Sequence, residues 1–151
     1  MANNIYTAGL WSTGPYQVSG MPFISGNIDV SAAGPDGIKI EFPYVTSWVQ
    51  IYNLDVTPVN VAFSKNGLQT NNFFQVTDAY RQGQGGRAKN FTGPMKLKVT
   101  EIWLSASEGT NIDPALCRDV DIVAGLTFIP VKQVTAISPS GSNWSGSVGV
   151  G

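Results

Sequence analysis

Residues 38–53 constrain the fold of this chain more than any other stretch. Their sequence, IKIEFPYVTSWVQIYN, alternates apolar and polar side chains on both sides of Pro43. An alternation with a period of two is typical of a β-strand that packs one face on a core and turns the other to water or to a partner. The stretch therefore predicts one strand at 38–42 and a second strand at 48–53.

The two faces of the second strand differ in character. Val49 and Ile51 are aliphatic, so we expect their side chains to face the core. Trp48, Gln50 and Tyr52 then face the opposite way, because successive side chains of a strand alternate. These three side chains are polar or aromatic and uncharged, which suits a surface covered by another subunit as well as a wet one.

Similar short runs recur along the chain and are separated by turn signals. They lie at 27–30, 59–63, 73–76, 95–99, 102–104, 120–128 and 131–137. The pattern shifts by one residue after Thr100 and Glu101, which predicts a β-bulge or a bend. Asn66-Gly67 predicts a hairpin turn, and Asp113 with Pro114 predicts one helical turn. About seven to nine strands with no clear amphipathic helix predict an all-β, antiparallel sandwich or jelly roll.

Three segments differ in composition. Residues 1–26 are rich in Gly, Ser, Asn and Pro with scattered aromatic residues, and we predict an extended N-terminal arm that can end in a short strand. Residues 27–137 hold the strand signals and predict a single sandwich domain. Residues 138–151, SPSGSNWSGSVGVG, predict a Gly/Ser-rich C-terminal tail.

The charge content argues against several classes of partner. Charged residues make up 13% of the chain, against about 25% in a typical soluble domain. A charge-poor surface loses little when another protein covers it, so this composition favours an assembled protein. The net charge of −1 gives no attraction to nucleic acid or to an anionic membrane. No apolar run approaches the ~20 residues that span a bilayer, and MANNIYTAGLW is not a signal peptide, so we expect synthesis in a cytoplasm.

The sequence predicts a protein that is not an enzyme and carries no cofactor or metal. The chain has no histidine, which removes the commonest general base, and one cysteine, Cys117, which we interpret as a small buried hydrophobe. Glu41 and Glu101 could in principle be the two catalytic carboxylates of a glycosidase, but charged residues on strands more often form cross-strand pairs. A cluster of three acidic residues lacks the spacing of a calcium loop; its members are Asp113, Asp119 and Asp121.

Five residues are predicted to contact another protein. Arg81, Arg87 and Lys89 lie in the Gly-rich loop RQGQGGRAK, which is either an anion-binding loop for an acidic partner or a solvated loop. Trp11 and Trp144 lie in the two irregular terminal segments and have no local core to join. These tryptophans either fold back on their own domain or dock in another subunit, and because aromatic side chains are frequent interface anchors we count them among the predicted interface residues.

Five segments of the chain resemble small virion proteins of tailed bacteriophages, particularly marine ones. They are YQVSGMPFISG at 16–26, IEFPYVTSWVQIYN at 40–53, GPMKLKVTEIWLSAS at 93–107, VAGLTFIP at 123–130 and NWSGSVGVG at 143–151. The resemblance implies a β-sandwich that is made in the host cytoplasm and attaches to the capsid exterior. It would act as a decoration or cement protein, often as a homotrimer, with the major capsid protein as its partner. The resemblance brings no catalytic residues.

Three other functions stay open at this point. A tail or neck component has the same sequence texture as a capsid decoration protein. A carbohydrate-binding or receptor-binding module is also consistent with exposed aromatic residues on a sandwich. An enzyme on a jelly-roll scaffold is the third, although the metal sites of such enzymes normally use histidine.

Overall fold

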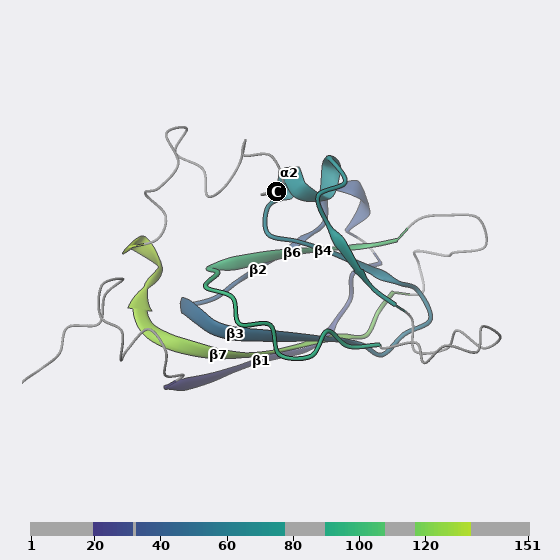
Figure 1. Cartoon of the computed structure of the whole chain (residues 1–151). Coiled ribbons are helices and arrows are strands. Elements are labelled where there is room, and N and C mark those ends of the chain that lie inside the picture. Colours follow the sequence, from purple (N-terminus) through teal and green to yellow (C-terminus); the bar gives the residue numbers. More distant parts are fainter. Residues whose placement is uncertain (1–19, 32, 78–89, 108–116, 134–151) are drawn as a thin grey trace, which may run out of the picture.

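The computed structural model describes residues 20–31, 33–77, 90–107 and 117–133. Two antiparallel β-sheets lie one above the other and form a sandwich (Figure 1). The all-β, antiparallel sandwich that the sequence predicts is therefore confirmed, and a jelly-roll connectivity stays a prediction.

The lower sheet in Figure 1 has three strands in the order β1-β7-β3. They are β1 (Met21–Ile28), β7 (Val120–Pro130) and β3 (Tyr44–Asn53). The central strand β7 comes last in the sequence and pairs antiparallel with both neighbours. Residues 21–26 of the predicted arm thus form most of β1, because alternate side chains of that strand pack on the core while the others face outward.

The upper sheet has four strands in the order β2-β6-β4-β5. They are β2 (Ile38–Glu41), β6 (Glu101–Ala106), β4 (Val59–Ala62) and β5 (Phe74–Val76). All three pairings are antiparallel. The strands that the sequence predicts at 38–42, 59–63, 73–76 and 102–104 are thus confirmed, with ends that differ by one or two residues.

One side of the sandwich is made by two chain segments that bend together from the upper sheet to the lower. β2 and β3 form one segment, and residues 90–106 run antiparallel beside it. The backbone N–H of Phe42 donates to Thr100 O over 2.9 Å at the bend, and Val49 and Met95 exchange two backbone hydrogen bonds of 2.8 and 2.9 Å. In Figure 1 residues 90–100 are the teal-green trace that follows the lower sheet and then rises into β6.

The prediction of a regular strand at 95–99 is wrong, although the predicted bend after it is confirmed. Within this segment Met95 alone forms a β-bridge with β3, to Val49, and the neighbouring bridge Tyr52–Phe91 lies before it. The backbone N–H of Leu97 donates to Met95 O over 2.9 Å, a local bond that takes it out of any ladder. The apolar alternation survives because Met95 and Val99 still pack against the core.

The Asn66-Gly67 turn is also different from the prediction. These residues lie in a short helix, α2 (Lys65–Gln69), whose N-cap Ser64 accepts a hydrogen bond of 2.9 Å from the Gly67 N–H to its Oγ. β4 and β5 still pair antiparallel, so the hairpin exists, but its connection is helical. The Leu68 side chain of this helix is buried, and its burial favours the helix over a two-residue turn.

Two 3-10 helices complete the described elements. The first, η1 (Gly34–Asp36), precedes β2, and the second, η3 (Val131–Gln133), follows β7. The sequence predicts a strand at 131–137, but residues 131–133 form a 3-10 helix instead. The proline at position 130 lacks the N–H that would continue a ladder. The predicted helical turn at Asp113 and Pro114 lies outside the described residues.

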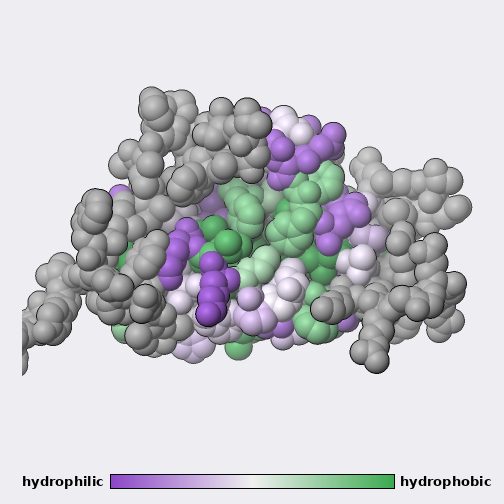
Figure 2. Space-filling view, in the orientation of Figure 1, coloured by the Kyte–Doolittle hydropathy of each residue, from purple (hydrophilic) through white to green (hydrophobic). Residues whose placement is uncertain are grey.

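The core lies between the sheets and is almost wholly aliphatic. Val49 and Ile51 of β3 are buried, as the alternation predicts, and pack against residues of β7 and the upper sheet. Trp48, Gln50 and Tyr52 are half-buried and face away from the core, which confirms the second half of that prediction. Figure 2 shows apolar surface gathered between the layers on the side where residues 90–100 run, with hydrophilic surface over α2.

Candidate docking surface

The outward side of the β1-β7-β3 sheet is built from rows of directly opposed residues. Ile24, Val123 and Gln50 form one row, because Val123 pairs with both of the others. Pro22, Gly125 and Trp48 form the next row in the same way. Directly opposed residues of antiparallel strands share one face. We call the surface made by these two rows, with Tyr52 and Asp121, the three-strand face.

The three-strand face is apolar and nearly uncharged. Ile24 is 72% exposed, the largest exposure among the big apolar side chains that the structure describes. Phe91, 41% exposed, extends the face beyond β3, where its ring lies 5.9 Å from that of Tyr52. Of the strand residues described on this face, Asp121 alone is charged, and its Oδ1 accepts a 2.9 Å hydrogen bond from the Asn27 N–H. A surface of this composition is typical of a protein contact.

A groove of about 740 Å³ runs along the β3 edge of this face. We call it the lysine groove; the described residues that line it are Ser47, Trp48, Gln50, Pro94, Lys96 and Lys98. Both charged residues in this list are lysines, whereas the chain as a whole has a net charge of −1. Burial lowers the pKa of Lys98, because desolvation disfavours its ammonium form.

Thr46 fixes the wall of the lysine groove. Its Oγ1 donates to Leu97 O over 2.6 Å and also lies 3.2 Å from Val99 O, and it accepts a 3.0 Å hydrogen bond from the Val99 N–H. These contacts replace the strand ladder that the segment lacks. They hold the backbone on both sides of Lys98, and they place Lys96 and Lys98 against β3.

The outward side of the upper sheet is polar. Gln75, Asn60 and Ser105 form a row across β5, β4 and β6. Gln75 Nε2 donates to Asn60 Oδ1 and to Ser107 Oγ, each over 3.0 Å, so these side chains are hydrogen-bonded to one another. They border a second hollow of about 410 Å³, which Phe73 also lines. The two outward sides of the sandwich therefore differ sharply in polarity.

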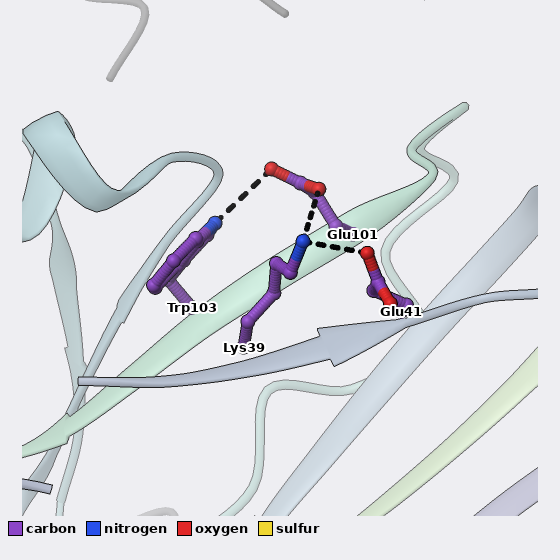
Figure 3. A network of polar contacts seen from close by, with 4 residues as sticks. All are labelled: Lys39, Glu41, Glu101 and Trp103. Atoms are coloured by element: carbon purple, nitrogen blue, oxygen red, sulfur yellow. Dashed lines mark hydrogen bonds and ion pairs between the residues drawn. The ribbon is translucent and has the colours of Figure 1, made fainter.

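Glu41 and Glu101 are tied into a charge network on this upper sheet and do not form an open catalytic pair (Figure 3). Lys39 Nζ lies 2.5 Å from Glu41 Oε1 and 3.7 Å from Glu101 Oε2. Trp103 Nε1 donates to the other oxygen of Glu101 over 3.1 Å. The Glu41 carboxylate, assisted by Glu101, raises the pKa of Lys39 above its ordinary value. The contact of Lys39 with Glu101 joins β2 to β6 and is the kind of cross-strand pair that the sequence indicates, whereas Lys39 and Glu41 lie on the same strand.

Cys117 is fully buried, as the sequence predicts. Burial, with the nearby carboxylates of Asp55 and Asp29, raises the pKa of its thiol to about 12. The thiolate is the reactive form of cysteine, and it is scarce at neutral pH when the pKa is this high. Cys117 therefore acts as a small packing residue, and its carbonyl accepts a 2.9 Å hydrogen bond from the Val30 N–H.

The predicted interface residues lie outside the described part of the chain. They are Trp11, Arg81, Arg87, Lys89 and Trp144. Asp113 of the acidic cluster lies outside it as well. In the described ranges, no three His, Cys, Asp or Glu side chains come close enough together to hold a metal ion. Those ranges also contain no helix that is long and apolar enough to cross a membrane.

Sequence reasoning missed four residues of this surface. Ile24 falls within the predicted N-terminal arm, and the sequence pattern indicates no contact role for Lys96, Lys98 or Phe91. A signal for the lysines was present, because their alternation with Met95, Leu97 and Val99 already places them opposite the apolar side chains. The row from Ile24 to Gln50 joins residues far apart in the sequence, and only the sheet register reveals it.

Comparison of the chain with protein-family models, with curated proteins and with solved structures finds no match.

Proposed function

We propose that this chain is a non-enzymatic virion structural protein of the capsid decoration or cement type. It docks on the capsid exterior by the three-strand face and bridges neighbouring subunits of the major capsid protein. The sequence resemblance to small phage virion proteins supports the placement on a virion. The exposed apolar side chain of Ile24, on the edge strand β1 of a nearly uncharged sheet face, is the observation that carries the docking role.

The proposed action is mechanical. A protein that binds only the assembled shell shifts the equilibrium away from the disassembled state, since binding stabilises whatever it binds. A homotrimer would attach at three points, and each contact can then be weak because the attachments act together. In this proposal Trp11 and Trp144, in the terminal segments, act as further anchors, and the loop with Arg81, Arg87 and Lys89 contacts the same partner.

Ile24→Lys is expected to weaken binding to undecorated capsids by about 30-fold or more, because charging an apolar side chain that anchors an interface typically costs about 2 kcal/mol or more. Val56→Lys is the matched control, since Val56 is also β-branched and 39% exposed but lies in the loop after β3. The measurement is occupancy of purified capsids by sedimentation at several protein concentrations. Equal binding by the two variants would remove the three-strand face from the proposal.

A carbohydrate-binding module is the second candidate, and the hollow on the upper sheet is the observation that favours it. Asn60, Gln75 and Ser105 supply amides and hydroxyls, the groups that hydrogen-bond sugar hydroxyls, and Phe73 offers a ring for stacking. A glycan array distinguishes the candidates. A glycan that binds wild type and not Gln75→Ala, together with no capsid binding, would favour this second function.

A further inference from the structure

One edge of the three-stranded sheet has no partner strand in the described part of the chain. At the β3 edge, residues 90–99 bond to the main chain of the strand and cover it. At the opposite edge, β1 pairs with β7 on one side, and no other described strand pairs with it. The open side of an edge strand presents unpaired N–H and C=O groups, which are a template for another strand.

The hydrogen bonds of β3 show which way the main chain of β7 points. Val49 exchanges backbone hydrogen bonds of 2.8 and 2.9 Å with residue 95, and the C=O of Ile51 accepts one of 3.0 Å from residue 92, so both point away from β7. The main-chain groups of successive residues in an antiparallel strand point to opposite sides. Those of Gln50 therefore point to β7, where its partner is Val123. The main-chain groups of Val123 thus bond to β3 and not to β1.

The same alternation fixes the direction of the main chain in β1. The residues on either side of Val123 point to β1, where they pair with Phe23 and Ser25. Phe23 and Ser25 therefore turn their main-chain groups to β7. The N–H and the C=O of Ile24, which lies between them, point to the open side of the sheet.

Two further main-chain groups point to the open side. In a trans peptide, the C=O and the N–H that follows it point in opposite directions. The Pro22 C=O is therefore opposed to the Phe23 N–H, and the Gly26 N–H is opposed to the Ser25 C=O. Pro22 fits this phase, because a proline within a sheet is confined to positions where the ladder needs no N–H. The open side of β1 thus alternates acceptor and donor groups from residue 22 to residue 26.

β1 lacks the charges with which natural edge strands prevent pairing. Its sequence, MPFISGNI, contains no charged residue, and the side of the strand that carries Pro22, Ile24 and Gly26 is exposed. The edge strands of the upper sheet are different, since β2 carries Lys39 and Glu41 and β5 has only three residues. Among the described edges, β1 is therefore the one best suited to accept another strand.

The outward groups of β1 are complementary to those of a second copy. When two β1 strands run antiparallel with Ile24 opposite Ile24, the two isoleucines exchange both of their backbone hydrogen bonds. The Pro22 C=O of each copy then accepts a hydrogen bond from the Gly26 N–H of the other copy. Each outward N–H finds an acceptor, although Pro22 itself has no N–H to offer. Such an arrangement is self-complementary, as a closed two-fold dimer requires.

We propose that two copies of this chain pair through β1, antiparallel and centred on Ile24, so that their three-stranded sheets join into one continuous sheet. Directly opposed residues share one face. Ile24, 72% exposed in the single chain, is therefore partly covered by the Ile24 of the other copy. The two three-strand faces lie side by side, on the same side of the dimer.

The inference goes beyond the proposed function and does not rest on it, because the pairing needs no capsid. It predicts a two-fold dimer in place of the homotrimer that the sequence resemblance implies. The decoration role is served by a dimer as well, since two faces on one side attach at two points that act together.

Sedimentation velocity of the full chain at several concentrations is the first test. We expect a monomer–dimer equilibrium for the wild type. Ile24→Pro and Ile24→Ala both remove the isoleucine side chain, but only the proline also removes the outward N–H. We expect Ile24→Pro to weaken dimerisation about 30-fold relative to Ile24→Ala, because each dimer loses two hydrogen bonds between the copies.

Amide hydrogen exchange of the wild type, followed by NMR, is the second test and needs no variant, so it stands even if Ile24→Pro does not fold. We expect exchange at the Ile24 and Gly26 amides to slow as the protein concentration rises, since these groups are bonded only in the dimer. The amides of Phe23 and Ser25 bond to β7 within each copy, and their exchange should change much less.

Three results would overturn the proposal. The first is a wild type that stays monomeric at every concentration or that forms a trimer. The second is equal dimerisation of Ile24→Pro and Ile24→Ala, which would place the contact elsewhere on the molecule. The third is exchange at the Ile24 and Gly26 amides that does not depend on concentration.

Discussion

Replacing Asn53 with Asp is expected to lower the free energy of unfolding at neutral pH by about 3–5 kcal/mol, the usual cost of an uncompensated buried charge. Asn53 is fully buried at the end of β3. Its Nδ2 donates to Thr57 O over 2.8 Å and lies 3.2 and 3.4 Å from Thr77 O and Val76 O. The variant carboxylate would face these carbonyl oxygens with no proton to donate. Urea unfolding followed by tryptophan fluorescence measures the loss.

The pH dependence of this variant separates charge from lost packing. Burial beside carbonyl oxygens raises the pKa of the new carboxyl in the folded state above its unfolded value. The penalty is therefore complete above the folded pKa and disappears as the pH falls to the ordinary value of about 3.9, where the group is protonated in both states. Asn53→Ala, which adds no charge, should lose stability by the same amount at every pH. A deficit of Asn53→Asp that does not shrink on acidification would contradict this account.

Gly37→Ala is expected to cost about 3–4 kcal/mol of unfolding free energy, the combined cost of a positive-φ backbone conformation that is essentially restricted to glycine and of an overpacked core. Gly37 has φ +71° just before β2. A Cβ at this position would lie 2.8 Å from Leu104 O of β6 and 2.4 Å from the Leu68 side chain. The backbone oxygen cannot move without disturbing the β2–β6 pairing, in which Leu104 is opposite Ile38.

Gly34→Ala provides the control for this prediction. Gly34 has φ +56°, and nothing lies within 4 Å of the Cβ that alanine would add. Its substitution therefore carries only the backbone cost of about 1–2 kcal/mol. The difference between the two variants, measured by thermal and urea unfolding, reports the contacts with Leu104 and Leu68 together with the more restricted backbone conformation of Gly37. Equal losses would show that the β2–β6 pairing does not approach Gly37 as closely as described.

The sequence was sufficient to predict the strands that pack one side on the core. Val49 and Ile51 alternate with Trp48, Gln50 and Tyr52, and burial follows the same alternation. The sequence was insufficient to predict segments in which local hydrogen bonds replace the backbone ladder of a strand. Ser64 caps a helix across Asn66-Gly67, and Thr46 replaces the ladder that the segment 95–99 lacks. Propensity and period do not report these side-chain bonds.

The candidate surface was less accessible to sequence reasoning than the fold. Trp48 and Gln50 were predicted to face away from the core, and they do. Ile24 and Val123 join them only because β7, late in the sequence, lies between β1 and β3. A single sequence contains no signal for which strands become neighbours across about a hundred residues, since the alternation of each strand is the same whichever neighbour it takes.

The two outward sides of the sandwich suit opposite environments. The three-strand face exposes Ile24 and Phe91 and has few charges, so burying it against a protein loses little hydration. The upper sheet carries the Lys39, Glu41 and Glu101 network, whose charges are favoured by contact with water. A protein with this polarity is expected to attach by its three-strand face and to turn its four-strand sheet outward.

The orientation of the bound protein tests this account most directly. Cryo-electron microscopy of decorated capsids, at a resolution that separates the two sheets, shows which of them contacts the shell. We expect the β1-β7-β3 sheet to lie against the major capsid subunits, with Ile24 and Trp48 buried and the Lys39 network facing solvent. The account is contradicted if the four-strand sheet contacts the shell, or if the protein occupies the tail and leaves the capsid bare.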